Sequence, residues 1–344
     1  NDKRTIYMVD MHEPLMFLHN LETTIKEPFA SNPAVLDAIE KNHRKLQMAM
    51  TKLYPGNLVI SLSSGVMHHR LVDRITALND VPREPLVPRR LGKNMCVPFG
   101  KILRGKVVPN TVTKTLHTDK VYEPDLNSFT IEPFPYYSPL KSQIETIKSF
   151  DRPVILVDDL VHKADRLQVL VPQLRENGIP IKKVVVGVLS GYGRDLMQCL
   201  KVPVESIYSM PNLRQWFVES TLYPFIGGDT VRREEMKVAG LQPSINMILP
   251  YATPRLSGCS REALVEFSAC CIENSRDLFQ VLEAEYRKMY AKNLTLSRLS
   301  EAVILPLCPD KGSCMEYDEN LAASVYLEND LETLWRMKEF LIKG

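Results

Sequence analysis

The fold is decided by the stretch Val154-Ile155-Leu156-Val157-Asp158-Asp159-Leu160-Val161-His162-Lys163-Ala164-Asp165-Arg166-Leu167. It begins with four apolar residues, the continuous pattern of a strand that is buried on both faces of a parallel sheet. Two carboxylates follow at the end of this predicted strand, and a short turn then leads into a predicted helix. Open α/β sheets bind ligands at the carboxyl ends of their strands, where the unpaired N–H groups of helix N-termini suit a phosphate. The stretch therefore predicts a ligand-binding edge.

Strands and helices alternate on both sides of this stretch. The pattern predicts strands at 58–62, 95–99, 154–157 and 183–189 and around Ile207, and helices at 67–78, 138–150 and 166–177. Such alternation is typical of βαβ units. We expect an α/β domain over residues 57–238, with a mostly parallel sheet and flanking helices.

Two further regions flank this domain. Residues 1–56 form an N-terminal extension, in which a short apolar run, Thr5–Val9, precedes a helix from Asn32-Pro33 to Leu53. Asn32 suits the N-cap and Pro33 the first helical position. Residues 239–344 are expected to form a C-terminal α-helical domain, with amphipathic patterns at 261–290, 294–304 and 330–342.

Composition narrows the class of protein. The 344 residues include 43 Lys and Arg against 41 Asp and Glu, a net charge of +2 that does not favour a nucleic-acid partner. No apolar run reaches the roughly eighteen residues of a spanning helix, so no membrane partner is expected. The seven cysteines include no C-x-x-C, which favours free thiols and a cytoplasmic protein. The chain begins with Asn1 instead of Met, which favours a segment of a longer protein.

Several families place acids at the end of a strand. An NTPase would need a G-x-x-x-x-G-K-[ST] loop, which the sequence lacks. A dinucleotide-binding fold would need G-x-G-x-x-G after the strand, which is also missing. A response-regulator receiver would need another aspartate on a later strand, and residues 206–209 supply none. These three interpretations are disfavoured.

The run Val154–Val161 resembles the phosphoribosyl pyrophosphate signature of type I phosphoribosyltransferases, which has apolar residues, two acids and two more apolar residues before a phosphate loop. The resemblance implies a type I phosphoribosyltransferase-like fold over about half of the chain. It also implies that Asp158 and Asp159 contact the ribose hydroxyls of the donor. One of them could take part in proton transfer or orient a water on Mg²⁺.

The phosphate loop departs from that family's usual Thr-Thr-Gly-x-Thr. Here the positions are occupied by His162, Lys163, Ala164, Asp165 and Arg166. Ala164 replaces a glycine, which matters if the backbone there needs a positive φ. The hydroxyl donors are replaced by cationic groups, which phosphate also accepts. Either the loop holds a phosphate through these groups, or it is a solvated turn that binds nothing.

Other segments match the resembled family in position. Ser63, Ser64 and Gly65 would form a pyrophosphate loop. Residues 101–122 are basic and would form a lid over an anionic substrate; Lys114 is one candidate contact. Further candidate contacts are Gly191, Gly193, Arg194 and Trp216, the last by stacking on a base. For each of these the alternative is a structural turn, a solvated hairpin or core packing.

Two functions remain open. The first is an Mg²⁺-assisted transferase that moves ribose 5-phosphate from phosphoribosyl pyrophosphate to a nitrogenous base, with a homodimer implied by the resemblance. The second is a catalytically silent module that binds a phosphosugar or nucleotide and regulates or scaffolds a larger protein. The segments His162-Lys163, Gly191–Asp195 and Pro224–Asp229 also resemble, more weakly, the accessory region of bacterial cytidylyltransferase-related proteins. The H-x-G-H motif of nucleotidyl transfer is missing.

Overall fold

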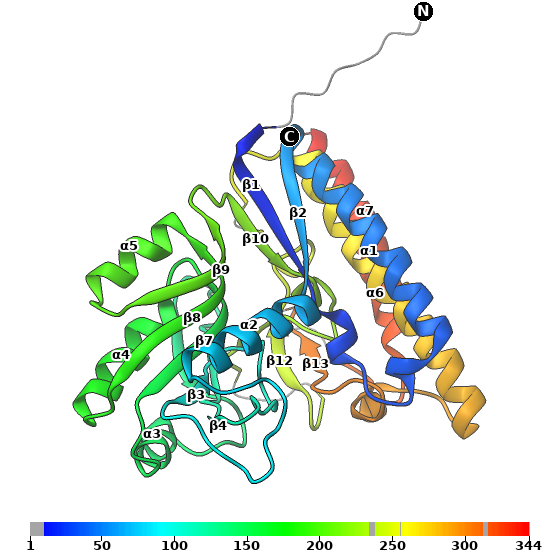
Figure 1. The fold of residues 1–344 in the computed structure, drawn as a ribbon. Helices are drawn as coiled ribbons and strands as arrows, with labels where there is room; N and C mark the ends of the chain where they lie inside the picture. Colours follow the sequence, from blue (N-terminus) through cyan, green and yellow to red (C-terminus); the bar gives the residue numbers. More distant parts are fainter. Residues whose placement is uncertain (1–9, 234–237, 255, 312–315, 344) are drawn as a thin grey trace, which may run out of the picture. The chain divides into compact units, whose positions relative to one another are not determined.

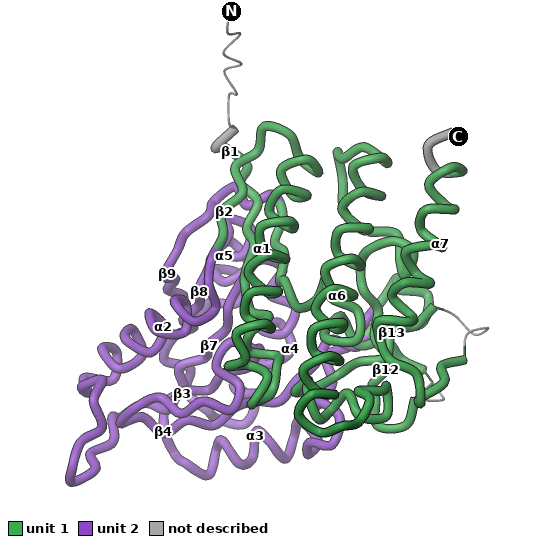
Figure 2. The backbone as a smooth tube through the Cα atoms, turned by 90° about the vertical axis from the view of Figure 1, so that its right-hand side faces the viewer, with its two compact units in different colours: residues 1–61, 122–128, 215–344 green, residues 62–121, 129–214 purple. Residues whose placement is uncertain are grey.

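The computed structural model describes residues 10–233, 238–254, 256–311 and 316–343. The predicted apolar run Thr5–Val9 therefore lies outside the described residues, as does Cys314. The chain forms two compact units (Figure 2). The first comprises residues 1–61, 122–128 and 215–344, and the second comprises residues 62–121 and 129–214.

A parallel sheet of five strands forms the centre of the second unit, in the order β4-β3-β7-β8-β9 (Figure 1). Its strands are β3 (Met95–Pro98), β4 (Val112–Thr113), β7 (Val154–Val161), β8 (Ile181–Ser190) and β9 (Val204–Met210). Its helices are α2 (Ser64–Leu78), α3 (Leu140–Lys148), α4 (Asp165–Glu176) and α5 (Gly191–Cys199). The short strands β5 (Thr118–Tyr122) and β6 (Phe129–Pro133) are neighbours. The predicted α/β class, with mostly parallel strands and flanking helices, is confirmed.

Helices cover both faces of this sheet, which explains why its strands are continuously apolar. Val184 and Val186 of β8 belong to an apolar cluster that α3 and α4 complete. Gly187 faces the opposite side, where a Cβ would lie 2.2 Å from the sulfur of Met67 in α2. The alternating side chains of β8 thus contact helices on either face.

Three long helices and two small sheets make up the first unit. The helices are α1 (Pro33–Leu53), α6 (Arg261–Tyr290) and α7 (Ala323–Lys343). One sheet has the order β10-β1-β2, with β1 (Asp10–His19), β2 (Asn57–Ser63) and β10 (Gln215–Val218). The strands β11 (Asp229–Val231), β12 (Gln242–Ile245) and β13 (Leu307–Pro309) lie next to one another in a second sheet. Short 3₁₀ helices are η1 (Leu21–Thr24), η2 (Phe29–Ser31), η3 (Glu219–Leu222) and η4 (Leu296–Glu301).

The long helices lie side by side, α6 between α1 and α7 (Figure 1). A reciprocal pair of buried asparagines joins α1 to α6. The Asn42 side chain donates to the Asn274 carbonyl at 2.8 Å, and the Asn274 side chain donates to the Asn42 carbonyl at 3.0 Å. Buried polar groups are tolerated when they are hydrogen-bonded in this way.

Most of the predicted elements form, with informative differences. The strand predicted at 58–62 forms as β2, but it lies beside β1 instead of in the five-stranded parallel sheet. The strand predicted at 154–157 continues through both aspartates to Val161. The segment 294–304 contains a 3₁₀ helix instead of an α-helix. The six cysteines among the described residues are free thiols. Within the described ranges, we find no helix with the length and apolar character needed to span a membrane.

The N-cap of α1 yields the first prediction. The Asn32 side chain accepts hydrogen bonds from the backbone of Ala34 at 2.9 Å and of Val35 at 3.3 Å. Replacing Asn32 with Ala removes these acceptors, so we expect the free energy of unfolding to fall by about 1 kcal/mol in urea titrations. Ser31→Ala is the matched control, because Ser31 bonds only to the exposed Glu27. An equal loss in both variants would contradict the capping role.

Candidate functional site

Two neighbouring parallel strands of the second unit end together and create a polar edge. The β7–β8 pairing extends to Val161 opposite Leu189, and α4 and α5 begin shortly after these residues. Beyond the last pair, His162 Nδ1 lies 2.8 Å from the Ser190 hydroxyl. That hydroxyl also accepts from the Gly193 backbone at 3.0 Å and caps α5. Two helix N-termini therefore meet at the edge where open α/β sheets bind their ligands.

The acidic pair lies inside β7, near this edge. Asp158 is 5 % exposed, and its Oδ1 accepts a hydrogen bond from the Asp159 backbone at 2.8 Å. The carboxylate packs directly on Gly100, where a Cβ would lie 1.7 Å from Oδ1. Glycine is thus required at position 100 for Asp158 to occupy this place.

Electrostatics separate Asp158 from an ordinary surface aspartate. Burial raises the pKa of its carboxyl well above the usual range, and the neighbouring Asp159 charge raises it further, while Arg166 opposes the rise. Burial therefore favours the neutral form of Asp158, and two neighbouring carboxyl groups of this kind can exchange a proton or hold a hard cation.

Two arginines face the acidic pair from different elements. Arg104 belongs to the turns after β3, and Arg166 lies in the first turn of α4. Burial lowers the pKa of Arg104, Asp119 raises it and Arg166 lowers it, so the two guanidinium groups repel each other. Nε and Nη2 of Arg104 and Nε of Arg166 are buried without a hydrogen-bond partner. Unpaired donors of this kind are uncommon in proteins and indicate a missing acceptor.

A small cavity of about 110 Å³ opens near Arg104. It is lined by Lys114, His117, Tyr137, Ser138, Ser142, Gln143 and Thr146. The His117 ring stacks on Tyr137 with centroids 3.8 Å apart, and its Nδ1 is buried without a partner. Burial lowers the pKa of His117, and the charges of Arg104 and Lys114 lower it further. The cavity could hold a phosphate-sized group but is smaller than the roughly 300 Å³ of a typical ligand pocket.

The predicted phosphate loop has a mixed character. Ala164 adopts φ +53°, the left-handed conformation that glycine would favour at this position. His162 is held by Ser190, and burial, followed by the charge of Lys163, lowers its pKa. Lys163 is exposed, whereas Asp165 pairs with Lys120 at 3.0 Å. Of the five loop residues, Arg166 is the one that faces the acidic pair.

The remaining predicted contacts lie in different places. Ser63 ends β2, and Ser64 and Gly65 begin α2, so no loop separates the strand from the helix. Gly191 and Gly193 lie in the first turn of α5. A Cβ would meet the Pro211 carbonyl oxygen at 2.5 Å in the first case and the Val161 carbonyl oxygen at 2.2 Å in the second. Close backbone packing thus accounts for both glycines.

Two further predicted contacts are on other surfaces. Arg194 is exposed, and its Nε lies 4.0 Å from Oδ1 of Asp195. Trp216 belongs to β10 in the first unit. It is half-buried and pairs with Met16 of β1.

Sequence reasoning overlooked three residues of this site and misjudged a fourth. Gly100 follows an apolar strand but belongs to no motif. Asp119 is a single acid in a basic segment, and Ser190 has the pattern of an ordinary N-cap residue. The sequence placed Arg104 in a lid or a solvated hairpin, whereas in the structure it is half-buried near Asp119, with its Cζ 4.8 Å from the centroid of the Phe134 ring. The apolar residues Ile102 and Leu103 directly before Arg104 were the one available signal.

The pKa of Asp158 predicts a pH-dependent stability. Because the pKa of Asp158 is raised in the folded state, the folded protein keeps a proton that the unfolded chain loses above about pH 4. The stability of the folded state therefore declines as the pH rises from about 4 towards the raised pKa of Asp158. Asp158→Asn stays neutral at every pH. We expect its melting temperature to exceed that of the wild type by a growing amount as the pH rises above about 4, in buffers without phosphate or divalent cations. Asp37→Asn, an exposed control on α1, should show no such trend. A constant offset for Asp158→Asn would contradict the raised pKa.

Ala164 yields a second prediction. Alanine at φ +53° is strained, so Ala164→Gly should raise the free energy of unfolding by about 0.5–1 kcal/mol in urea titrations. The same replacement at Ala284, an exposed position inside α6, should lower it by about 1 kcal/mol. If both substitutions destabilise the protein, the left-handed conformation of Ala164 is wrong.

No protein-family model matches the sequence, and no curated protein matches it significantly. The functional assignment therefore depends on the residues and geometry described above.

Proposed function

We propose that the second unit binds a phosphorylated sugar at the β7–β8 edge and acts as a type I phosphoribosyltransferase-like enzyme. It would transfer ribose 5-phosphate from phosphoribosyl pyrophosphate to a nitrogenous base. The observation that carries the proposal is the buried, unpaired N–H groups of Arg104 and Arg166 beside the acidic pair.

The unpaired N–H groups of these arginines lack an acceptor. A buried donor without an acceptor costs about 1–3 kcal/mol, and two guanidinium groups at one place repel each other as well. A phosphate or diphosphate would accept several of their N–H groups at once, since the planar guanidinium fork matches its oxygens. The two helix N-termini at the same edge add a favourable field for negative charge.

The acids suit the rest of the donor. Carboxylate oxygens of Asp158 and Asp159 are hard ligands of the kind that Mg²⁺ prefers, directly or through water. When bound, Mg²⁺ would supply positive charge to the leaving diphosphate. A nearby cation would also favour the ionised form of Asp158, which is otherwise disfavoured by burial.

The chain's own residues account for the remaining chemistry. The bond between the anomeric carbon and the diphosphate oxygen breaks, both electrons leave with the diphosphate, and a nitrogen of the base bonds to that carbon. The ionised carboxylate of the pair stabilises the positive charge that develops on the sugar. It can also accept the proton that the base nitrogen loses. Arg104 and Arg166 hold the departing anion.

The silent binding module is the second candidate, and two observations favour it. The loop lacks the hydroxyl donors of the resembled family and carries Asp165 at the N-terminus of α4, where a carboxylate repels phosphate. The nearby cavity, about 110 Å³, is smaller than a typical ligand pocket. Under this alternative the same arginines bind a phosphosugar or nucleotide without turnover.

The heat of binding of phosphoribosyl pyrophosphate, with and without Mg²⁺, tests the site. We expect micromolar binding that requires Mg²⁺ and is lost in the Asp158→Asn/Asp159→Asn double variant. Arg104→Met and Arg166→Met should each weaken it by about 10-fold or more, because each removes charge-assisted hydrogen bonds. Arg175→Met is the matched control, since Arg175 is an exposed residue of the same helix that bonds to the Lys201 carbonyl.

The two functions differ in turnover. The transferase predicts release of pyrophosphate with at least one base in a panel of purines, pyrimidines and their precursors. Binding without release with any base would favour the silent module. If neither phosphoribosyl pyrophosphate nor any nucleotide binds, or if Arg175→Met weakens binding as much as Arg166→Met, the assignment of this site is wrong.

A further inference from the structure

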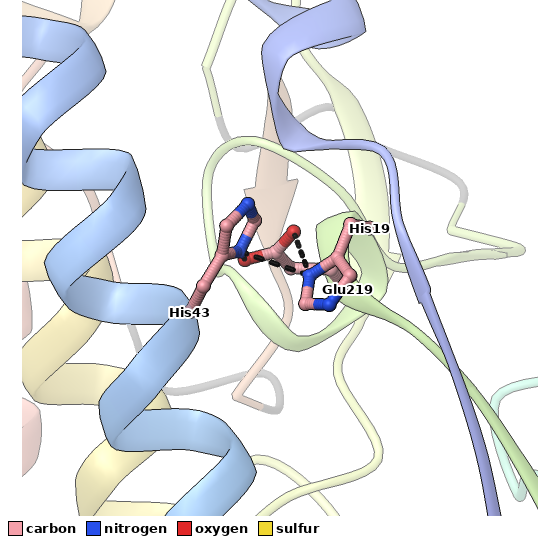
Figure 3. A group of neighbouring side chains, drawn as sticks. All are labelled: His19, His43 and Glu219. Atoms are coloured by element: carbon pink, nitrogen blue, oxygen red, sulfur yellow. Dashed lines mark hydrogen bonds and ion pairs between the residues drawn. The ribbon is translucent and has the colours of Figure 1, made fainter. Parts of the chain in front are cut away.

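Three potential metal ligands meet in the first unit. Figure 3 shows His19, His43 and Glu219 pointing toward one another from three different elements. Their ligand atoms all lie within 4.8 Å of one another. The Glu219 side chain is fully buried, and the side chains of His19 and His43 are 16 % and 18 % exposed. The group is therefore enclosed but still accessible to a small ion.

The fold holds this group in place by strand register. β1 and β10 are parallel, and Leu18 lies opposite Val218. The residues that follow this pair are His19, the last residue of β1, and Glu219, which comes directly after β10. Two hydrogen bonds join the residues that come next, Asn20 and Ser220. The Asn20 side chain donates to the Ser220 hydroxyl at 2.9 Å and accepts from the Ser220 backbone at 2.9 Å. Positioning by backbone pairing and such a clamp gives the precision that a metal site needs.

The distances suit a single ion. Ligands bound to zinc at about 2.0–2.1 Å in a tetrahedron lie about 3.3 Å apart. Nδ1 of His19 and Nδ1 of His43 are 3.1 Å apart, and Glu219 Oε2 is 3.7 Å from His19 Nδ1. Glu219 Oε1 is closer to His43 Nδ1, at 2.5 Å, as expected for a hydrogen bond in the absence of an ion. Small movements would bring all three ligands to zinc distances.

Protons alone leave this group incompletely satisfied. One proton between His43 and Glu219 makes the 2.5 Å hydrogen bond, but Glu219 Oε2 remains buried without a hydrogen-bond partner. The Nδ1 atoms of His19 and His43 also lie 3.1 Å apart, and two unprotonated imidazole nitrogens are both acceptors that cannot bond to each other. A cation among the three groups would satisfy the lone pairs of both nitrogens and of the carboxylate.

We propose that His19, His43 and Glu219 bind one divalent transition-metal ion of the zinc class. Two imidazole nitrogens and one carboxylate favour zinc, iron, cobalt or nickel over Mg²⁺ and Ca²⁺, which prefer oxygen ligands. Three protein ligands leave a coordination position for water or a substrate, as in catalytic zinc sites. The proposal concerns the first unit alone and is independent of the function proposed for the second.

A further side chain orients one of the ligands. Nε2 of Gln47 lies 3.4 Å from Nε2 of His19 and donates to the Ser61 hydroxyl at 2.6 Å. When Nδ1 of His19 binds a metal, Nε2 of His19 carries the proton, and the Gln47 amide, turned so that its oxygen takes the place of its nitrogen, would accept from both His19 and Ser61. Gln47 is therefore a positioning residue for the proposed site.

Titration with Co²⁺ after removal of bound metal by a chelator tests the proposal on the full chain. We expect one Co²⁺ per chain with the visible absorption bands of a four-coordinate ion. Zn²⁺ should displace it, and an excess of Mg²⁺ should not. Glu219→Gln and His43→Gln should abolish the bands, and Gln47→Ala should weaken binding by about 10–100-fold. His69→Gln, at an exposed histidine of α2, is the control and should bind like the wild type.

Several results would overturn the proposal. These are the absence of cobalt bands in the wild type, equal binding by Glu219→Gln and the wild type, and displacement by Mg²⁺. Circular dichroism verifies that each variant is folded. If Glu219→Gln and His43→Gln fail to fold, Gln47→Ala decides, because Gln47 is half-buried and lies outside the ligand group. Unchanged Co²⁺ affinity in Gln47→Ala would then count against the site.

Discussion

The parallel pairing of β7 with β8 is the constraint on which the second unit depends. Both strands are buried by helices on their two faces, so their apolar residues fix the register from Ile155 to Val161. That register makes the strands end together, and α4 and α5 begin shortly after them. His162 and Ser190 meet for this reason, and two helix N-termini point at the same place. The polar edge is thus a consequence of how the core packs.

The charges near this edge reduce stability in the absence of a ligand. Asp158 is a buried acid, and Arg104 and Arg166 present unpaired donors where water does not reach them. Apolar residues would fill this space at lower cost, since a buried charge needs a partner to offset its lost hydration. Destabilising groups that converge on one place are characteristic of functional sites, where the ligand supplies the missing interactions. Gly100 supports this interpretation, because it gives the Asp158 carboxylate its room.

Local patterns predicted the helices and strands of the chain better than they predicted the contacts between them. The apolar run of β7, the Asn32-Pro33 cap of α1 and the long pattern of α6 are signals within one segment, and all three elements form. The partner of β2 depends on segments distant in sequence, so its apolar pattern did not distinguish the parallel sheet from the sheet with β1. The same limit applies to Arg104. Its position in a basic, Pro- and Thr-rich segment predicted a lid or a solvated hairpin, whereas tertiary packing buries two of its side-chain nitrogens.

The group of His19, His43 and Glu219 had no sequence signal, because its members are separated by long stretches and share no spacing. Its geometry nevertheless follows the rule that governs the other candidate site. His19 ends β1 and Glu219 directly follows β10, and these strands are parallel neighbours in register. In both units, polar side chains gather where two parallel strands end together, because the backbone stops pairing there and a helix begins shortly after each strand. Pairs of parallel strands are therefore the places at which we propose that this chain holds a ligand in a fixed geometry, a phosphate in one unit and a metal ion in the other.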